Sequence, residues 1–124
     1  MNFSLALILA AAGGIGTFLR ALFMGAAEKF APSFPWATFV VNIVGSFAIG
    51  IAWALTKERT SLSPLQFKVI ATGLLGGFTT FSAFSLDSIL LLQEGAYARA
   101  ALYIFLSPAL GILSATGGIF LLRL

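Results

Sequence analysis

Four long apolar runs constrain this chain more than any other feature of its sequence. They cover roughly residues 3–26, 36–56, 65–92 and 98–122. Crossing the hydrocarbon core of a bilayer takes about 20 predominantly apolar residues of helix, because that core is about 30 Å thick. Of the 124 residues, 60% are hydrophobic and only 9% are charged, which is too little charge for the surface of a soluble domain. We therefore expect an all-α membrane protein in which residues 1–124 form a single four-span transmembrane domain.

The third run carries an internal helix-breaking signal. A straight helix over residues 65–92 would be roughly 42 Å long, more than one upright crossing needs. Gly76-Gly77 followed by Thr79-Thr80 should interrupt it, since paired glycines weaken a helix and threonine hydroxyls compete for backbone carbonyls. We predict a break near Gly76-Thr80. Lipid tolerates a break only where protein or a polar cavity satisfies the freed backbone groups, so this is a candidate ion site.

Turn signals separate the runs and set the topology. The connections are Glu28 to Pro35, the charged segment Lys57 to Pro64, and Gln93-Glu94-Gly95. Ser63-Pro64 is typical of a helix start, because proline is tolerated at the first helical position. Four spans place both termini on one side of the membrane.

The basic residues are divided almost evenly between the two sides of this topology. The side with the termini carries Lys57, Arg59, Lys68 and Arg123, and the other carries Arg20, Lys29 and Arg99. The positive-inside rule therefore gives no firm orientation. Two interpretations stay open: one basic residue is assigned to the wrong side and decides the orientation, or the protein inserts both ways and pairs as an inverted dimer.

Polar residues inside the spans recur at helical spacing. Thr38, Asn42 and Ser46 share one face of the second span, and Tyr103 and Ser107 share one face of the fourth. Such groups either bond between helices or line a path for a polar solute. Asn42 favours the second role, because its amide is more polar than a hydroxyl and lies a turn inside the membrane.

Phe81 and Phe84 are three residues apart and can share a face of the third span, with Phe78 within reach. Packing in the core is the ordinary role of such side chains. A functional role would use the ring quadrupole, whose positive edge can face an anion without holding it tightly. Conduction needs that balance, because an ion that binds too well cannot leave.

Several classes of function are excluded or disfavoured. Histidine and cysteine are absent and no pair of acids converges, so an enzyme is not expected. A net charge of +3 gives no reason to expect a nucleic acid partner. A small multidrug antiporter would need a carboxylate in the first span, which has none, although a proton-coupled exporter using Asp87 stays open. A holin-like assembly would explain the small residues but not Asn42 or the broken span.

Three motifs resemble the Fluc (CrcB) fluoride channels over nearly the whole chain. They are Gly-Gly-Phe-Thr-Thr-Phe-Ser-Ala-Phe-Ser at 76–85, Thr38-Phe39-Val40-Val41-Asn42 with Gly45, and Gly16-Thr17-Phe18-Leu19-Arg20. The resemblance implies a channel domain that exports cytoplasmic fluoride passively from a prokaryote across its plasma (inner) membrane. It also implies an antiparallel, dual-topology homodimer in the lipid bilayer, with two fluoride pores at the subunit interface.

The resemblance further implies a role for individual residues. A structural sodium ion is implied at the dimer centre, held by the backbone carbonyls of Gly76 and Thr79. The implied fluoride pathway consists of the pore phenylalanines Phe81 and Phe84, Asn42 facing the ion, Tyr103 and Ser107 at the start of a polar track on the fourth span, Thr38 as a flanking hydroxyl, and Arg20 in the vestibule. From its position alone, Arg20 could equally extend to the lipid headgroups.

The chain departs from the family pattern at three positions. Ala83 stands between the two phenylalanines where many members have threonine or serine. Gly111 and Ala115 stand where the track on the fourth span would continue with hydroxyls. Ser114 and Thr116 are close in sequence, but a helix would point them elsewhere. The outer part of the predicted track therefore lacks its hydroxyls.

Overall fold

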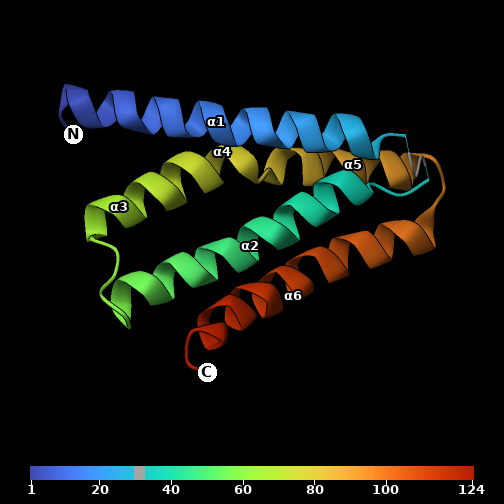
Figure 1. The fold of residues 1–124 in the computed structure, drawn as a ribbon. Coiled ribbons are helices and arrows are strands. Elements are labelled where there is room, and N and C mark those ends of the chain that lie inside the picture. Colours follow the sequence, from blue (N-terminus) through green and yellow to red (C-terminus); the bar gives the residue numbers. More distant parts are fainter. Residues whose placement is uncertain (30–32) are drawn as a thin grey trace.

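The four predicted spans are all present in the computed structural model, which describes residues 1–29 and 33–124 (Figure 1). Helices that are long and apolar enough to cross a membrane cover Phe3–Ala27, Trp36–Lys57, Pro64–Gln93 and Tyr97–Leu121. Each lies within one residue of the expected bounds at either end. Both termini lie at the same end of the molecule, as an even number of spans requires.

The spans form two packed pairs. The helix α1 (Phe3–Ala27) lies along the third span, and α2 (Trp36–Lys57) lies along α6 (Tyr97–Leu121) and crosses in front of the third span (Figure 1). The predicted loop from Glu28 to Pro35 falls partly on residues 30–32, which lie outside the described residues. The other two turns are where the sequence placed them, and Gly95 adopts the left-handed φ of +76° that closes the last one.

The third span is a chain of four helical segments: α3 (Pro64–Lys68), the π-helix η1 (Val69–Leu75), α4 (Gly76–Phe78) and α5 (Phe81–Gln93). Ser63 starts it with a capping box, in which its side chain accepts the Gln66 N–H while the Gln66 side chain accepts the Ser63 N–H. The seven π-helical residues were not expected from the sequence. π-Helical turns are rare and occur frequently at functional sites.

The predicted break is confirmed at Thr79 and Thr80, where the backbone becomes extended. Their dihedral angles are φ −85°, ψ 159° and φ −149°, ψ 111°. Thr80 also begins α5, since its side chain accepts the Ala83 N–H at 3.2 Å. The helical part of the third span before the break continues two residues beyond Gly76, to Phe78. The two glycines therefore precede the break instead of forming it.

Glycines allow the helices in each pair to touch through their backbones. A side chain at Gly77 would overlap the carbonyl of Gly13 on α1. A side chain at Gly118 on α6 would overlap the Phe47 carbonyl on α2. Small residues serve this purpose in membranes, where close van der Waals packing replaces the hydrophobic effect between helices.

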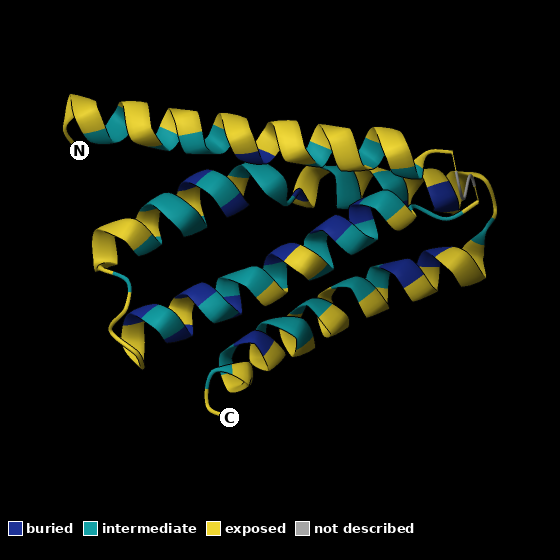
Figure 2. Cartoon of the chain, in the orientation of Figure 1, coloured by how far each residue is buried: buried dark blue, intermediate teal, exposed yellow. Residues whose placement is uncertain are grey.

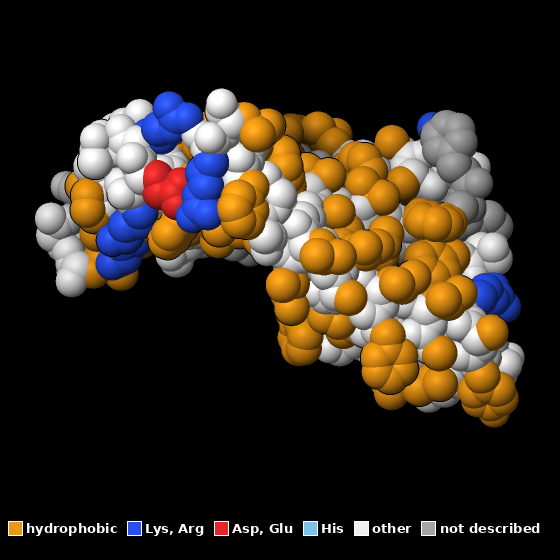
Figure 3. All heavy atoms as spheres, turned by 90° about the horizontal axis from the view of Figure 1, so that it is seen from below, with side chains coloured by type: hydrophobic (Ala, Val, Ile, Leu, Met, Phe, Trp, Pro, Cys, Tyr) orange, Lys and Arg blue, Asp and Glu red, His pale blue; other side chains and the backbone are white. Residues whose placement is uncertain are grey.

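Most of the surface is apolar, and the charges gather at the ends. Exposed residues cover most of α1, while the buried residues concentrate on α2 (Figure 2). Lysine and arginine side chains surround an acidic one at the end with the termini (Figure 3). There Arg123 forms a salt bridge with Glu58, and its hydrogen bond and charge lower the pKa of the Glu58 carboxyl. This distribution suits a bilayer with aqueous layers on both sides.

Arg20 lies elsewhere than the sequence suggested. Its Nε donates to the Gly77 carbonyl at 3.0 Å, in the middle of the third span. It therefore bonds within the bundle instead of extending toward the lipid headgroups, and it is not counted with the basic residues at either end of the molecule. The face with the termini keeps four, and the opposite face keeps Lys29 and Arg99.

Adjacent glycines on α6 test the backbone packing. Gly118→Ala should destabilise the protein by about 1–3 kcal/mol, because the new methyl group has no space. Gly117→Ala should be neutral or slightly stabilising, since nothing lies within 4 Å of its added Cβ and alanine favours helix. Thermal unfolding of the purified proteins in detergent would measure both. Equal stability of the two variants would contradict the packing described here.

Candidate functional site

The break is held open by the side chain of Asn42 on α2. Its Nδ2 donates to the Thr80 carbonyl at 3.0 Å, and its Oδ1 accepts the Thr80 N–H at 2.8 Å. One amide side chain thus replaces both helical partners that Thr80 has lost. The sequence placed Asn42 on the ion path. The structure shows that one donor and the acceptor oxygen of this side chain already bond the break, which is half of its hydrogen-bonding capacity.

A second element satisfies the break from the opposite side. The Gly77 carbonyl accepts from Arg20 Nε at 3.0 Å and lies 3.5 Å from the Thr17 hydroxyl, both on α1. Among the described residues, no carboxylate lies within ion-pair distance of Arg20. An arginine that bonds the middle of a membrane-spanning helix without a counter-ion is expensive, and its positive charge favours any anion that approaches.

Two carbonyl groups at the break have no hydrogen-bond donor among the described residues. Within the described part of the chain, no hydrogen bond reaches the carbonyl oxygens of Gly76 or Thr79. Thr80 would pair with Gly76 in a continuous helix, but its N–H is bound to Asn42 instead. Freed carbonyls of this kind suit a hard cation such as sodium, which prefers oxygen ligands.

A cavity of about 490 Å³ opens beside the break, between α2, α6 and the third span. No lysine, arginine, aspartate or glutamate is among its described lining residues. Its polar side chains belong to Asn42, Ser46, Thr79, Thr80 and Ser107, and Phe81 and Phe84 form part of its apolar wall. Uncharged donors and aromatic rings therefore meet at the interrupted backbone.

The two phenylalanines are adjacent, as their spacing predicted. Their ring centroids lie 5.8 Å apart at an interplanar angle of 38°. Phe81 is 79% exposed, which is far too much for a ring that serves the core of this chain. Phe84 is half-buried and packs on Tyr103, with ring centroids 5.1 Å apart.

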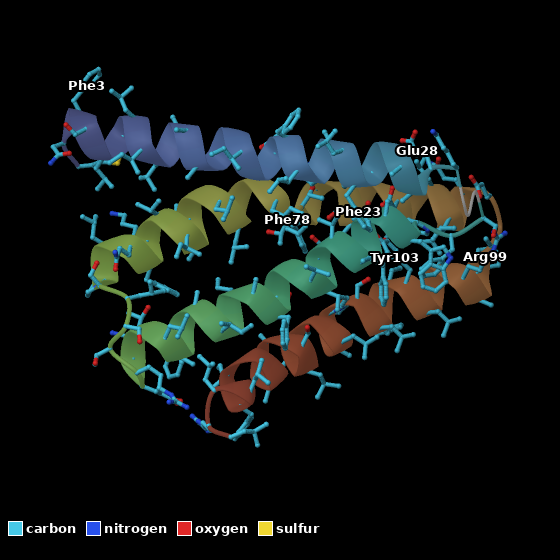
Figure 4. The ribbon with its side chains drawn as sticks, in the orientation of Figure 1. Phe3, Phe23, Glu28, Phe78, Arg99 and Tyr103 are labelled. Carbon is cyan, nitrogen blue, oxygen red and sulfur yellow. The ribbon has the colours of Figure 1, made fainter. Side chains whose placement is uncertain are left out.

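Tyr103 lies in the core and not in this cavity. It points from α6 into the bundle (Figure 4) and is fully buried. Its hydroxyl donates to Asp87 Oδ2 at 3.1 Å. Thr38 is also buried, and it lines a separate hollow near Asp87. The predicted sites at Tyr103 and Thr38 are thus set apart from Asn42, the phenylalanines and Ser107.

The hydroxyl oxygen of Ser107 has no hydrogen-bond partner. Among the described residues, it is the one buried polar side-chain atom of which this is true. Gly111 and Ala115 continue the cavity wall beyond it without a hydroxyl. Ser114 instead donates to the Ile43 carbonyl at 3.0 Å and Thr116 to the Ile112 carbonyl at 2.8 Å, so neither fills the gap in the track.

The structure thus brings together one group of the predicted residues at the cavity: Asn42, Gly76, Thr79, Phe81, Phe84 and Ser107. Sequence reasoning missed the pairing of Thr80 with Asn42 and the bond between Tyr103 and Asp87. The sequence did contain a signal that Thr80 begins a helix, because threonine before a helical run is a preferred N-cap. No local pattern could have paired Tyr103 with an acid on another span.

Comparison with known proteins assigns the chain to a family. The family model described as "CrcB-like protein, Camphor Resistance (CrcB)" matches residues 7–119. A protein of Roseiflexus sp. (strain RS-1) named fluoride-specific ion channel FluC is 44% identical over 114 residues, covering 91% of this chain and 89% of its own length. FluC proteins of Rhizobium meliloti (strain 1021) and Agrobacterium fabrum are 40% and 42% identical, each over 94% of both chains. This chain is therefore a four-span membrane protein of the CrcB family.

Proposed function

We propose that the protein is a passive, fluoride-selective ion channel that exports cytoplasmic fluoride. The main observation that supports this proposal is the cavity beside the break. It brings together phenyl rings and hydroxyl groups, and its described lining contains no titratable side chain. A lysine there would hold an anion too tightly for conduction, and a carboxylate would repel it. The similar proteins carry the name of a fluoride channel, not of an enzyme.

Weak donors would replace the water around a fluoride ion in this cavity. Ser107 has an unused hydroxyl, and the Asn42 amide keeps one N–H beyond its bonds to Thr80. The edges of the Phe81 and Phe84 rings add a positive quadrupole face. Arg20 would act through its charge at the break, which offsets part of the penalty for an anion in a low-dielectric region.

Passive conduction is favoured over proton-coupled export by the place of Asp87. Its carboxylate accepts the Tyr103 hydroxyl and lines the separate hollow, not the cavity that Phe81 and Phe84 line. A coupled exporter would need this acid on the path of the transported ion. Fluoride efflux should therefore proceed from liposomes without a proton gradient.

The active form in this proposal is an antiparallel homodimer with two pores. An exposed Phe81 and a cavity along one side of α2 and α6 leave the path incomplete in one subunit. A second, inverted copy would close it on each side of a two-fold axis. The relatives come from bacteria, so we place the dimer in the prokaryotic plasma (inner) membrane.

A sodium ion at the dimer centre is part of the same proposal. The unpaired carbonyls of Gly76 and Thr79 fit it, and two subunits would supply four oxygen ligands. Its chemistry would be structural, because it offsets repulsion between carbonyls and links the subunits. No described group of three acidic, histidine or cysteine side chains offers another cation site.

Replacing either ring tests the ion path. Phe81→Ile and Phe84→Ile should each reduce fluoride efflux from liposomes by about tenfold or more, which corresponds to roughly 1.4 kcal/mol. Packing alone predicts a modest loss, since isoleucine stays apolar. Phe105→Ile is the matched control, because that ring is 72% exposed on α6 and lies outside the cavity. Near-normal efflux in both pore variants would assign the rings to packing.

Single cysteines test the inverted dimer. The native chain has none, so labelling has no background. Ser33→Cys and Ser61→Cys place exposed thiols at opposite ends of the molecule. Dual insertion predicts that an impermeant reagent labels about half of each variant from either side of the membrane. If all molecules share one orientation, each variant labels from one side and the two variants label from opposite sides.

Sodium removal tests the cation site apart from conduction. The dimer should lose thermal stability when sodium is replaced by a large organic cation, and sodium should restore it. Thr79→Ser should respond like the native protein, because only backbone oxygens are required. Unchanged unfolding and dimer content in sodium-free solution would exclude a structural sodium ion.

A further inference from the structure

The polar track on α6 lacks a hydroxyl at Gly111, and a hydroxyl on α2 faces this position. Gly111 lies one turn beyond Ser107 and lines the same cavity. A Cβ built at Gly111 would lie 3.4 Å from Ser46 Oγ, its nearest neighbour outside its own helix. The Ser46 hydroxyl therefore occupies the space beside the place where a side chain at 111 would begin.

Ser46 can change its hydrogen-bond partner without breaking its own helix. Its Oγ donates to the Asn42 carbonyl at 2.7 Å, one turn earlier on α2. Membrane helices use this back-bond to satisfy a hydroxyl that has no other acceptor. Rotation of the side chain or the O–H bond redirects the proton into the cavity, and the rest of the helix is unaffected.

The Asn42 amide and the Thr80 hydroxyl are more firmly engaged than the Ser46 hydroxyl. The Asn42 amide holds the Thr80 backbone at two points, and the Thr80 hydroxyl caps α5. The Thr79 hydroxyl makes the same kind of back-bond as Ser46, to the Leu75 carbonyl at 2.9 Å, but it belongs to the third span and does not face Gly111 across from α6. Ser107 and Ser46 are left as two hydroxyls on opposite helices that can turn toward a common guest.

We propose that Ser46 is an anion-binding residue of this cavity, and that α2 supplies through it the hydroxyl that α6 lacks at Gly111. The inference deepens the proposed channel function and rests on it. The guest is a small anion with strong hydrogen-bond acceptor character, of which fluoride is the smallest. Donors from two helices would surround such an ion better than a track confined to one.

Moving the hydroxyl between helices tests this assignment. Ser46→Ala should reduce fluoride efflux from liposomes by about tenfold, since a hydrogen bond to a charged group is lost. The double variant Ser46→Ala with Gly111→Ser should recover most of that loss, because it returns a hydroxyl to the same space from α6. Size-exclusion profiles and thermal unfolding should match the native protein in both.

Thr56→Val is the control for hydroxyl removal. Thr56 is buried on the same helix and donates to the Ala52 carbonyl at 2.8 Å in the same way, but it lies outside the cavity. It should keep native efflux. Native efflux in Ser46→Ala, an equal loss in Thr56→Val, or no recovery in the double variant would overturn the role of Ser46. The native protein separates the two proposals: if it fails to conduct fluoride, the channel function itself is wrong.

Discussion

The pairing of the Asn42 side chain with the Thr80 backbone is the interaction on which the rest of the site depends. A bilayer offers no water to an unpaired N–H or C=O, and each such group costs several kcal/mol. Asn42 satisfies one of each at distances of 2.8 and 3.0 Å. The extended residues can persist in the membrane only because α2 delivers this amide. The same contact sets α2 against α5 and forms one wall of the cavity.

Arg20 complements Asn42 from the other side of the third span. It satisfies the Gly77 carbonyl and brings a positive charge to the middle of the third span. Close packing makes this reach possible, because Gly13 and Gly77 let α1 touch the third span through its backbone. One side chain therefore has both a structural and an electrostatic consequence. The break is stabilised, and its surroundings become favourable to an anion.

The structure also separates groups that share a helix face in the sequence. Tyr103 and Ser107 are one turn apart on α6, but Tyr103 is buried against Asp87 while Ser107 lines the cavity. The carboxylate is thereby excluded from the lining of the cavity, and its hydrogen bond to tyrosine stays inside the core. The cavity retains only neutral donors, which can bind an ion weakly enough to release it.

The sequence alone determined the features that local chemistry controls. Apolar run length specified the four spans, Ser63-Pro64 the start of the third, and Gly76 to Thr80 its interruption, because each depends on neighbouring residues and the thickness of a bilayer. Family motifs pointed to Asn42, Phe81, Phe84 and Ser107. Only the tertiary structure decided that Asn42 and Arg20 satisfy the break, that Tyr103 turns to Asp87, and that Ser46 faces Gly111. These contacts join residues on different spans, and their partners depend on how the helices cross, which no periodicity along one helix encodes.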